Sequence, residues 1–253
     1  MPENPGATYV VDGAVATITF SRPEVSNSIN LPTALALSAA VDAAAADEDV
    51  RVIVIRGDGP RFCAGGDASW FAAAEDSHAA LLELAGVLDG ALQRLALLPK
   101  PVVAAVQGAA AGAGLGVVLA ADLVISTRSA RFLTAYANIA LTPDCGVSWL
   151  LPRTVGLHRA LELTLAGRVL SADEAQEWGL VATVVDDDAL DSAVHELVSR
   201  LAQASPFALG NAKRLIRSSL AVSRETSGDD EARTIARASL TTDAKAATAR
   251  FAK

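Results

Sequence analysis

Residues 100–126, KPVVAAVQGAAAGAGLGVVLAADLVIS, decide the fold class of this chain. Residues 101–106 are short, apolar and rich in valine, which predicts a buried strand. A turn made of the smallest residues follows, then a helix through about Ala121, and residues 123–126 form a second strand. Two strands joined through a helix favour parallel pairing with a crossover connection, and therefore an α/β core.

The alternation of strands and helices continues on both sides of this stretch. In chain order, the patterns predict a hairpin at 8–20 with its turn at Asp12-Gly13, a helix at 31–46, a strand at 50–56 and a helix at 78–97. Beyond about residue 189 the strands stop, and helices are predicted at 189–203, 206–222 and 229–252. We therefore expect an α/β core over residues 1–188 and a helical segment over residues 189–253.

Length, charge and hydropathy bound the possible functions. The 253 residues, 51% of them hydrophobic, can form a large domain with a substantial core. The formal net charge of −8 disfavours nucleic acids and anionic membranes as partners, because both bind basic surfaces. The longest apolar run, about 102–126, is interrupted by Gln107, Asp122 and four glycines, which is wrong for a membrane span. The N-terminus has no secretory-signal pattern, so we expect a cytoplasmic protein.

Histidines and cysteines give no sign of a metal site. His78, His158 and His195 are widely spaced and show no ligand pattern. Cys63 and Cys145 do not make a disulfide framework, and their spacing favours small buried residues over ligands or nucleophiles. We therefore expect no metal.

Two glycine-containing turns follow predicted strands. In 61–67, RFCAGGD, adjacent glycines permit a sharp turn with exposed N–H groups, although an ordinary loop is the simpler interpretation. The turn at 107–116, QGAAAGAGLG, opens a helix whose first N–H groups favour negative charge, or else allows close helix packing. A dinucleotide-binding fingerprint is disfavoured, because its third glycine would fall at Val117 and no acidic residue follows at the usual distance.

A third stretch, 140–153, ALTPDCGVSWLLPR, places one acidic residue in apolar surroundings. Asp144 follows Pro143, which is typical of the N-cap of a short helix running to about Leu151. A carboxylate in an apolar pocket is also suited to proton transfer, and the stretch alone does not decide between these roles.

Taken together and in order, five stretches resemble the crotonase superfamily, the enoyl-CoA hydratase/isomerase family. They are ITFSRPEVSNSIN (18–30), RFCAGGD (61–67), the stretch 100–126, ARFLTAYANIALTPDCG (130–146) and LSADEAQEWGLVATVV (170–185). The resemblance implies a spiral of ββα units with a C-terminal helical part, usually assembled as trimers or dimers of trimers. It therefore implies an oligomerisation role for residues 189–253.

The resemblance also implies how the substrate is held. In this family two backbone N–H groups bind the thioester oxygen as it becomes an enolate, and they correspond to Gly66 and Ala113 here. The coenzyme A part of the substrate is expected beside four further residues: Ala64 and Ala68 around the adenine, Arg22 near the phosphates, and Asp67 between the two alanines in sequence. No separate cofactor is implied, because coenzyme A arrives as part of the substrate.

The departures from the family pattern narrow the reaction. Hydratases of the family use two glutamates, and the corresponding positions here are Gly116 and Tyr136. The remaining acidic residue at a catalytic position is Asp144, which matches the working aspartate of isomerase branches, including the phenylacetate-pathway ring-epoxide isomerases. The dehalogenase branch is disfavoured, because it needs a histidine base and this chain has Asp89 at the comparable position.

We therefore expect an acyl-CoA isomerase that moves a double bond or opens a strained ring. Asp144 would transfer the proton, and Tyr136 would line the pocket or donate a hydrogen bond. Two alternatives stay open: an enoyl-CoA hydratase with an atypical site, and a crotonase homologue that binds acyl-CoA without turnover. The expected partners are an acyl-CoA thioester and further copies of the chain in a trimer or hexamer.

Overall fold

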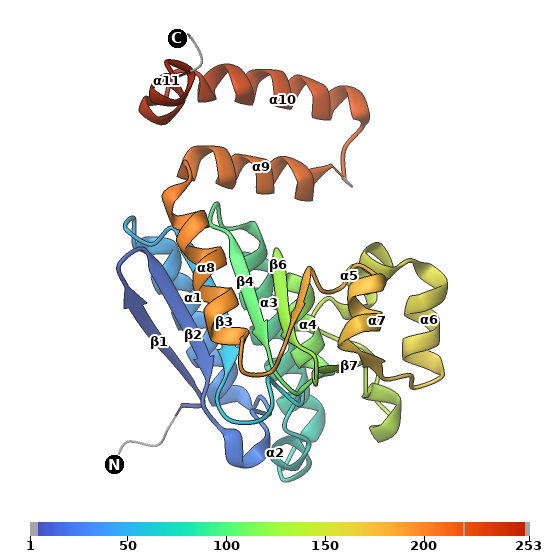
Figure 1. Ribbon diagram of the computed structural model, residues 1–253. Helices are drawn as coiled ribbons and strands as arrows, with labels where there is room; N and C mark the ends of the chain where they lie inside the picture. The colour runs from blue at the N-terminus through green and yellow to red at the C-terminus, as the bar shows by residue number, and fades with distance from the viewer. Residues whose placement is uncertain (1–4, 220, 251–253) are drawn as a thin grey trace.

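A six-stranded sheet with helices on both faces forms the centre of the computed structural model, which describes residues 5–219 and 221–250 (Figure 1). Its strands follow the order β1-β2-β3-β4-β6-β9, and only the hairpin β1–β2 is antiparallel. Their bounds are β1 Ala7–Asp12, β2 Val15–Phe20, β3 Val52–Gly57, β4 Val102–Val106, β6 Leu123–Thr127 and β9 Thr183–Val185. The predicted hairpin, buried strands and parallel crossovers are confirmed.

A second, smaller sheet was not predicted. It consists of β5 (Ala109–Ala111), β7 (Arg131–Leu133) and β8 (Leu170–Ser171) in that order. Strands this short do not contain enough residues for a period-two pattern, so sequence reading took the first of them as part of a glycine-rich turn. The small sheet matters for function, because β5 leads directly into the helix that presents Ala113.

The helices of the α/β part pack on the main sheet, beside the small sheet or against one another (Figure 1). They are α1 Leu31–Ala46, α2 Ala68–Ala72, α3 Ser77–Leu97, α4 Ala113–Ala120, α5 Val147–Val155, α6 Leu157–Leu165 and α7 Ala172–Glu177, with the 3-10 helices η1 Pro23–Val25 and η2 Tyr136–Ile139. The predicted helix at 31–46 is confirmed at both ends, and the one predicted at 78–97 begins one residue earlier. Asn30 caps α1 by accepting from the Thr33 N–H, and Pro32 suits the first turn.

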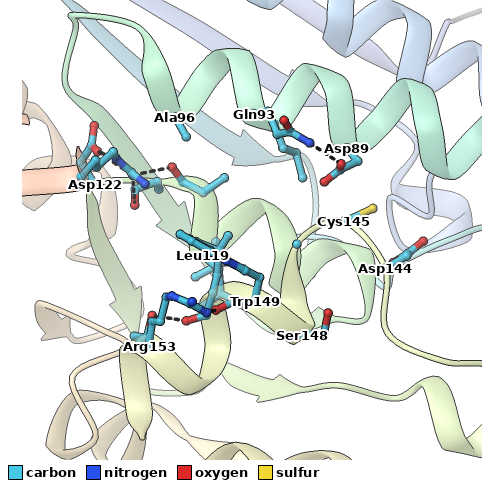
Figure 2. Close-up of a pocket in the computed structure, with 18 of the residues that line it drawn as sticks. Asp89, Gln93, Ala96, Leu119, Asp122, Asp144, Cys145, Ser148, Trp149 and Arg153 are labelled. Carbon is cyan, nitrogen blue, oxygen red and sulfur yellow. Dashed lines mark hydrogen bonds and ion pairs between the residues drawn. The ribbon is translucent and has the colours of Figure 1, made fainter. Parts of the chain in front are cut away.

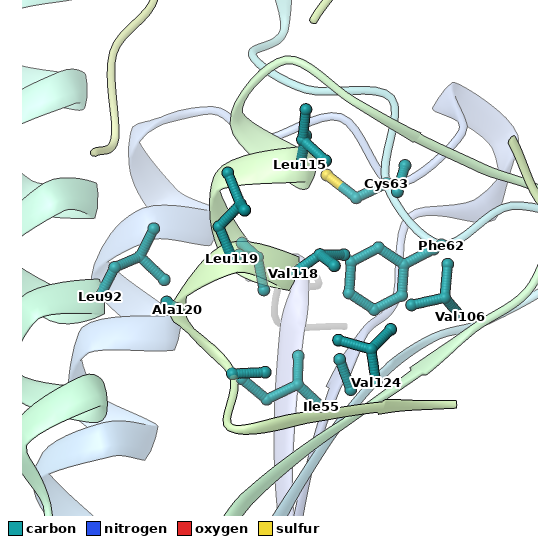
Figure 3. Close-up of a cluster of buried hydrophobic side chains, with 14 of the residues drawn as sticks. Ile55, Phe62, Cys63, Leu92, Val106, Leu115, Val118, Leu119, Ala120 and Val124 are labelled. Carbon is teal, nitrogen blue, oxygen red and sulfur yellow. The ribbon is translucent and has the colours of Figure 1, made fainter. Parts of the chain in front are cut away.

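Apolar packing divides into two layers, one on each face of the sheet. The larger core lies between the sheet and α1, α3 and α4, where Phe62, Leu115 and Val118 pack beside strand residues such as Val106 and Val124 (Figure 3). On the opposite face α8 (Leu190–Gln203) covers the valines of β3 and β4 (Figure 1). The alternation along β3 explains this division, because successive side chains of a strand point to opposite faces.

The C-terminal helices α9 (Pro206–Ser218) and α10 (Arg224–Ala238) lie side by side beyond one end of the sheet (Figure 1). Asp122, at the start of β6, joins α9 to the core through Lys213 Nζ at 2.7 Å and Arg217 Nη2 at 2.7 Å. Thus α8 packs as part of the α/β core, although the sequence placed it in the helical segment, and the helices that leave the core begin with α9.

The prediction of one continuous C-terminal helix is wrong, because the structure has two helices there. The segment predicted as one helix at 229–252 forms α10, which begins earlier at Arg224, and the separate α11 (Thr242–Thr248). Thr241 accepts a hydrogen bond from the Ala244 N–H and so caps a new helix, which a threonine favours over continuing the old one. Residues 251–253 lie outside the described residues. Within the described part of the chain, none of the helices combines the length and apolarity that crossing a membrane requires.

Candidate active site

The two glycine-containing loops are joined to each other by backbone hydrogen bonds. The Cys63 N–H donates to Ala109 O at 3.0 Å, and the Ala111 N–H donates to Cys63 O at 3.0 Å. Gly65 lies close to the second loop: its φ is +100°, and a Cβ there would lie 2.9 Å from Ala111 O. Only glycine fits both the backbone conformation and the space, so the two loops are held as one unit.

The N–H group of Gly66 is left without a partner by the pairing around it. Ile29 N–H donates to Gly65 O at 2.8 Å, and Asp67 N–H donates to Ile29 O at 2.8 Å. In this parallel bridge the middle residue, Gly66, points its own N–H away from Ile29. Within the described residues this N–H has no hydrogen-bond acceptor, and Gly66 is solvent-exposed.

Ala113 supplies a second free N–H from the other loop. It is the first residue of α4, where a helix leaves its N–H groups without intrahelical acceptors. Gly112 is the N-cap, with φ +52°, and it offers no side chain to cap the helix. The described residues provide no acceptor for the Ala113 N–H. The predicted donors Gly66 and Ala113 therefore come from loops that the structure ties together.

The capping role considered for Asp144 is wrong. Helix α5 begins at Val147, with Gly146 as its N-cap and no side-chain cap hydrogen bond, and it ends at Val155 rather than at Leu151. Only the backbone carbonyl of Asp144 contributes, accepting from the Val147 N–H at 2.9 Å. Its carboxylate is therefore free for another role, and the turn at Cys145 and Gly146, both with positive φ, delays the start of the helix.

Tyr136 holds the Asp144 carboxylate and touches the donor loops. Its hydroxyl donates to Asp144 Oδ1 at 2.7 Å. Burial, and next the negative charge of Asp144, raise the pKa of Tyr136 above its usual value, so the phenol keeps its proton. A Cβ placed on Gly112 would lie 3.9 Å from the Tyr136 ring and 3.7 Å from Gly65 Cα. Tyr136 therefore links the carboxylate to the donor loops.

A cavity of about 980 Å³ extends from Asp144 between α3, α4 and α5 (Figure 2). Its walls are mainly apolar, with Leu92, Leu119 and Trp149 among them. Asp89, Cys145 and Asp144 gather at one end of the cavity, and Asp122 lies at the other (Figure 2). The size and composition suit an apolar organic group that extends along the cavity to Asp144.

Two-carboxylate hydration would need a glutamate at position 116, and the space around Gly116 does not admit one. A Cβ on Gly116 would lie 2.9 Å from Cys145 O and 3.0 Å from Cys145 Cβ. Helix α4 and the 144–146 turn therefore approach so closely that only glycine fits here. The carboxylate that Tyr136 links to the donor loops is that of Asp144.

The model of a known family matches residues 11–253, and its description is enoyl-CoA hydratase/isomerase. The chain belongs to this family. It is 40% identical over 210 residues to a 1,2-epoxyphenylacetyl-CoA isomerase from Escherichia coli (strain K12), covering 82% of this chain and 80% of the relative. It is 38% identical over 202 residues to a trans-2-decenoyl-(acyl-carrier-protein) isomerase from Streptococcus mutans, covering 78% of this chain and 76% of the relative.

The solved structures agree with this assignment. A crystal structure of an enoyl-CoA hydratase/isomerase from Mycobacterium abscessus superposes with a TM-score of 0.91 at 32% identity, covering 97% of this chain and 95% of that one. The predicted crotonase-type α/β fold with C-terminal helices is thereby confirmed. The chain therefore belongs to a family of enzymes that includes hydratases and isomerases.

Of the four residues expected near coenzyme A, two are exposed and the other two bind each other. Ala64 and Ala68 are exposed on either side of the Gly66 loop. Asp67 is buried: it accepts from Ser69 Oγ at 2.6 Å and from Arg22 Nη1 at 3.0 Å, and it caps α2. Burial alone would raise the pKa of Asp67, but the hydrogen bonds from Ser69, Arg22 and the Trp70 N–H together hold it below its usual range. Arg22 and Asp67 thus bind each other, and their contact with coenzyme A stays a prediction.

Both cysteines are buried thiols, as the sequence predicted. Burial raises the pKa of Cys63 to about 12 and, together with the charge of Asp144, that of Cys145 above its usual value. Neither sulfur is a thiolate at neutral pH, so neither is suited to act as a nucleophile.

Sequence reading missed the polar residues on the cavity side of α3. Asp89 entered the prediction only as a departure from the dehalogenase pattern, and Gln93 did not enter it. Asp89 and Gln93 are four residues apart, so they share one face of α3, and the Gln93 side chain donates to Asp89 Oδ2 at 2.6 Å. The four-residue spacing was visible in the sequence. It was not read as part of a site, because a polar pair on a helix usually faces solvent.

Proposed function

We propose that this family member is an acyl-CoA isomerase that shifts a double bond or opens a strained ring through a thioester enolate. The observation that carries the proposal is the Asp144 carboxylate, which is held by the Tyr136 hydroxyl at the reactive end of an apolar cavity. The N–H groups of Gly66 and Ala113 bind the thioester oxygen as it gains negative charge. Donors already in place for that charge lower the barrier to removing a proton from the acyl chain.

The proton movement is balanced within the site. Asp144 takes a proton from one carbon of the acyl chain, and the electron pair of that C–H bond moves into the enolate. The enolate electrons then form a C–H bond at another carbon, and the proton is returned to the substrate. Tyr136 keeps one carboxylate oxygen occupied, so the other oxygen is the one available to the substrate.

An isomerase is favoured over a two-carboxylate hydratase by the space around α4. Gly116 cannot be replaced by a glutamate without displacing the backbone of Cys145, and Tyr136 occupies the second position with a hydrogen-bond donor. The relatives support the same choice, because the two reported above are described as isomerases of thioester substrates.

The binding partners follow from the same proposal. Coenzyme A enters as part of the thioester, its adenine beside Ala64 and Ala68 and its phosphates toward Arg22, and no separate cofactor takes part. The chain assembles as a trimer or a dimer of trimers in the cytoplasm. Apolar side chains of the C-terminal part support assembly, because Ile216 on α9, Ile235 on α10 and Leu240 in the following turn are 71%, 73% and 70% exposed.

The direct experiment adds 3-enoyl-CoA and, separately, a ring-epoxide acyl-CoA to the purified protein. With 3-enoyl-CoA, the absorbance of the conjugated 2-enoyl thioester should rise. Asp144→Asn should lower kcat by about 1,000-fold, because it removes the proton-transfer group and keeps its shape. The matched control is Glu83→Gln, which removes one negative charge from α3 outside the cavity and should leave kcat unchanged.

Three results would contradict the proposal. Hydration of 2-enoyl-CoA without isomerisation of either substrate would show a hydratase with an atypical site. Binding of a broad acyl-CoA panel without turnover would show a non-catalytic homologue. Full activity of Asp144→Asn would remove Asp144 from the reaction.

A further inference from the structure

The cavity contains a second carboxylate that the proposed mechanism has not used. Asp89 lies on α3, on a different wall from Asp144, and both residues line the same cavity. The other α3 side chains in that wall are Gln93 and small or apolar residues, namely Leu82, Ala85, Gly86, Leu92, Ala96 and Leu97. Asp89 is thus a half-buried carboxylate among mainly small and apolar neighbours, and the function proposed above gives it no role.

Asp89 is held in one orientation by a single donor. Gln93 Nε2 donates to Asp89 Oδ2 at 2.6 Å. The other oxygen, Oδ1, faces the turn that carries Asp144: a Cβ built on Gly146 would lie 3.9 Å from it. Among residues 5–219 and 221–250, no lysine, arginine or histidine forms an ion pair with Asp89 or Asp144. Oδ1 is therefore free of a neutralising partner.

The two carboxylates flank one side chain, Cys145. After burial and the influence of Asp144, the charge of Asp89 also raises the pKa of the Cys145 thiol, so both carboxylates act on the same sulfur. Figure 2 shows Asp89 beyond Cys145 as seen from Asp144, on the side of α3 that continues past Gln93 and Ala96 toward Asp122. Asp89 thus lies closer than Asp144 to the Asp122 end of the cavity (Figure 2).

We propose that Asp89 is a second proton-transfer residue, which receives the proton from Asp144 and delivers it to a carbon farther along the acyl chain. This inference rests on the isomerase function proposed above. Asp144 takes the proton as the first C–H bond breaks, and a water molecule in the cavity passes a proton on to Asp89. Asp89 then protonates the distant carbon as the enolate electrons form the new C–H bond. Both carboxylates end as they began, so the step needs no other reactant.

The relay also predicts which substrates are handled best. A single carboxylate can serve only carbons within its own reach, whereas two carboxylates on different walls extend the distance over which a double bond can move. The preferred substrate class is therefore an acyl-CoA in which the accepting carbon lies beyond the first double-bond position from the thioester.

The test is isomerisation in D₂O, with deuterium in the product measured by mass spectrometry. In the wild-type enzyme the relayed proton exchanges with solvent, so most product molecules should carry deuterium at the accepting carbon. Asp89→Asn should lower kcat by about 100-fold, a typical effect of removing an acid–base group. Its residual turnover through Asp144 alone should return the substrate's own hydrogen and lower the deuterium content. Glu83→Gln, on the same helix but outside the cavity, should change neither quantity.

The outcomes separate this inference from the proposed function. Wild-type isomerisation with Asp89→Asn equal to it in rate and deuterium content would overturn the relay and leave the isomerase intact. A lower rate with unchanged deuterium content would also overturn the relay, since it would show only a structural effect. Absence of isomerisation in the wild type would overturn both.

Discussion

The two sides of the candidate site use different chemical groups, main-chain amides on one side and side chains on the other. The donor side uses main-chain N–H groups of Gly66 and Ala113, positioned by hydrogen bonds between the two loops. The proton-transfer side uses the side chains of Asp144 and Tyr136, positioned by one hydrogen bond and a tight turn. The first side therefore depends on backbone geometry and tolerates changes of side chain, whereas the second depends on the identity of two side chains.

The strained backbone of the chain gathers around both sides. Among the described residues, five that are not glycine have positive φ: Ser26, Asn27, Ala135, Ala140 and Cys145. Ser26 O accepts from the Ala64 N–H beside the donor loop, and the last three surround Tyr136 and Asp144. Strain of this kind persists where the surrounding packing enforces it, which is typical of functional sites.

Removal of one N–H tests the donor side most directly. Ala113→Pro deletes the amide hydrogen at the first position of α4, where proline is compatible with the helix. We expect kcat to fall by about 100- to 1,000-fold, as for other losses of an oxyanion donor. Ala113→Ser retains the N–H and should keep activity near the wild-type level. If Ala113→Pro remains fully active, the main chain is not the donor at this position.

Removal of one hydroxyl tests the proton-transfer side. Tyr136→Phe keeps the ring against Gly112 but deletes the donor to Asp144 Oδ1. A hydrogen bond to a charged group contributes about 1.5–3 kcal/mol, so kcat should fall by about 10- to 100-fold, with a smaller change in KM. Steady-state kinetics with 3-enoyl-CoA measure both quantities. A change confined to KM would instead assign Tyr136 to substrate packing.

A third variant tests the close packing of α4 against the 144–146 turn, where the two sides of the site meet. Gly116→Ala places a Cβ 2.9 Å from Cys145 O, and overpacking of this kind should lower the free energy of unfolding by about 1–3 kcal/mol. Gly86→Ala is the matched control: no heavy atom lies within 4 Å of its Cβ position in α3, so it should raise stability by about 0.5–1 kcal/mol. Urea unfolding measures both. Equal stabilities would show that the 144–146 turn moves freely away from α4.

The smallest expected effect concerns Asp67, beneath the donor loop. Its folded-state pKa lies below the unfolded value, so its contribution to stability is present at neutral pH and is lost as the pH falls below about 4. Asp67→Asn should therefore make the unfolding midpoint less sensitive to acid between pH 5 and pH 3. Urea midpoints across this range test the prediction, and an unchanged slope would contradict it.

The two donor loops could be located from their glycine patterns, whereas Gly66 and Ala113 were identified as donors only through the family resemblance. Gly65 and Gly112 have positive φ and so favour glycine for backbone reasons, and glycine patterns of this kind are visible in one sequence. The strands and helices that carry the loops also show clear periodicity. What the sequence did not show is that the loops are joined through Cys63, because hydrogen bonds between distant loops leave no local pattern.

The proton-transfer side was harder to predict. Asp144 was identified, but its capping role was wrong, because the positive φ of Cys145 delays α5 and a single sequence does not show such a turn. Tyr136 was identified only through the family resemblance, and its hydrogen bond to Asp144 depends on a contact between η2 and the 144–146 turn. The orientation of Asp89 toward the cavity depends on the packing of α3.

The backbone bridge between Cys63 and Ala110 has a consequence for protein engineering. Because main-chain hydrogen bonds set the spacing of the Gly66 and Ala113 N–H groups, which we propose as oxyanion donors, we expect variants that keep these bonds to keep the spacing. Residues of α3 and the 144–146 turn can then be exchanged without rebuilding the thioester-binding half. A library that varies only Asp89, Gln93, Asp144 and Trp149 would therefore sample new reactions and new acyl groups while the proposed donor loops stay constant.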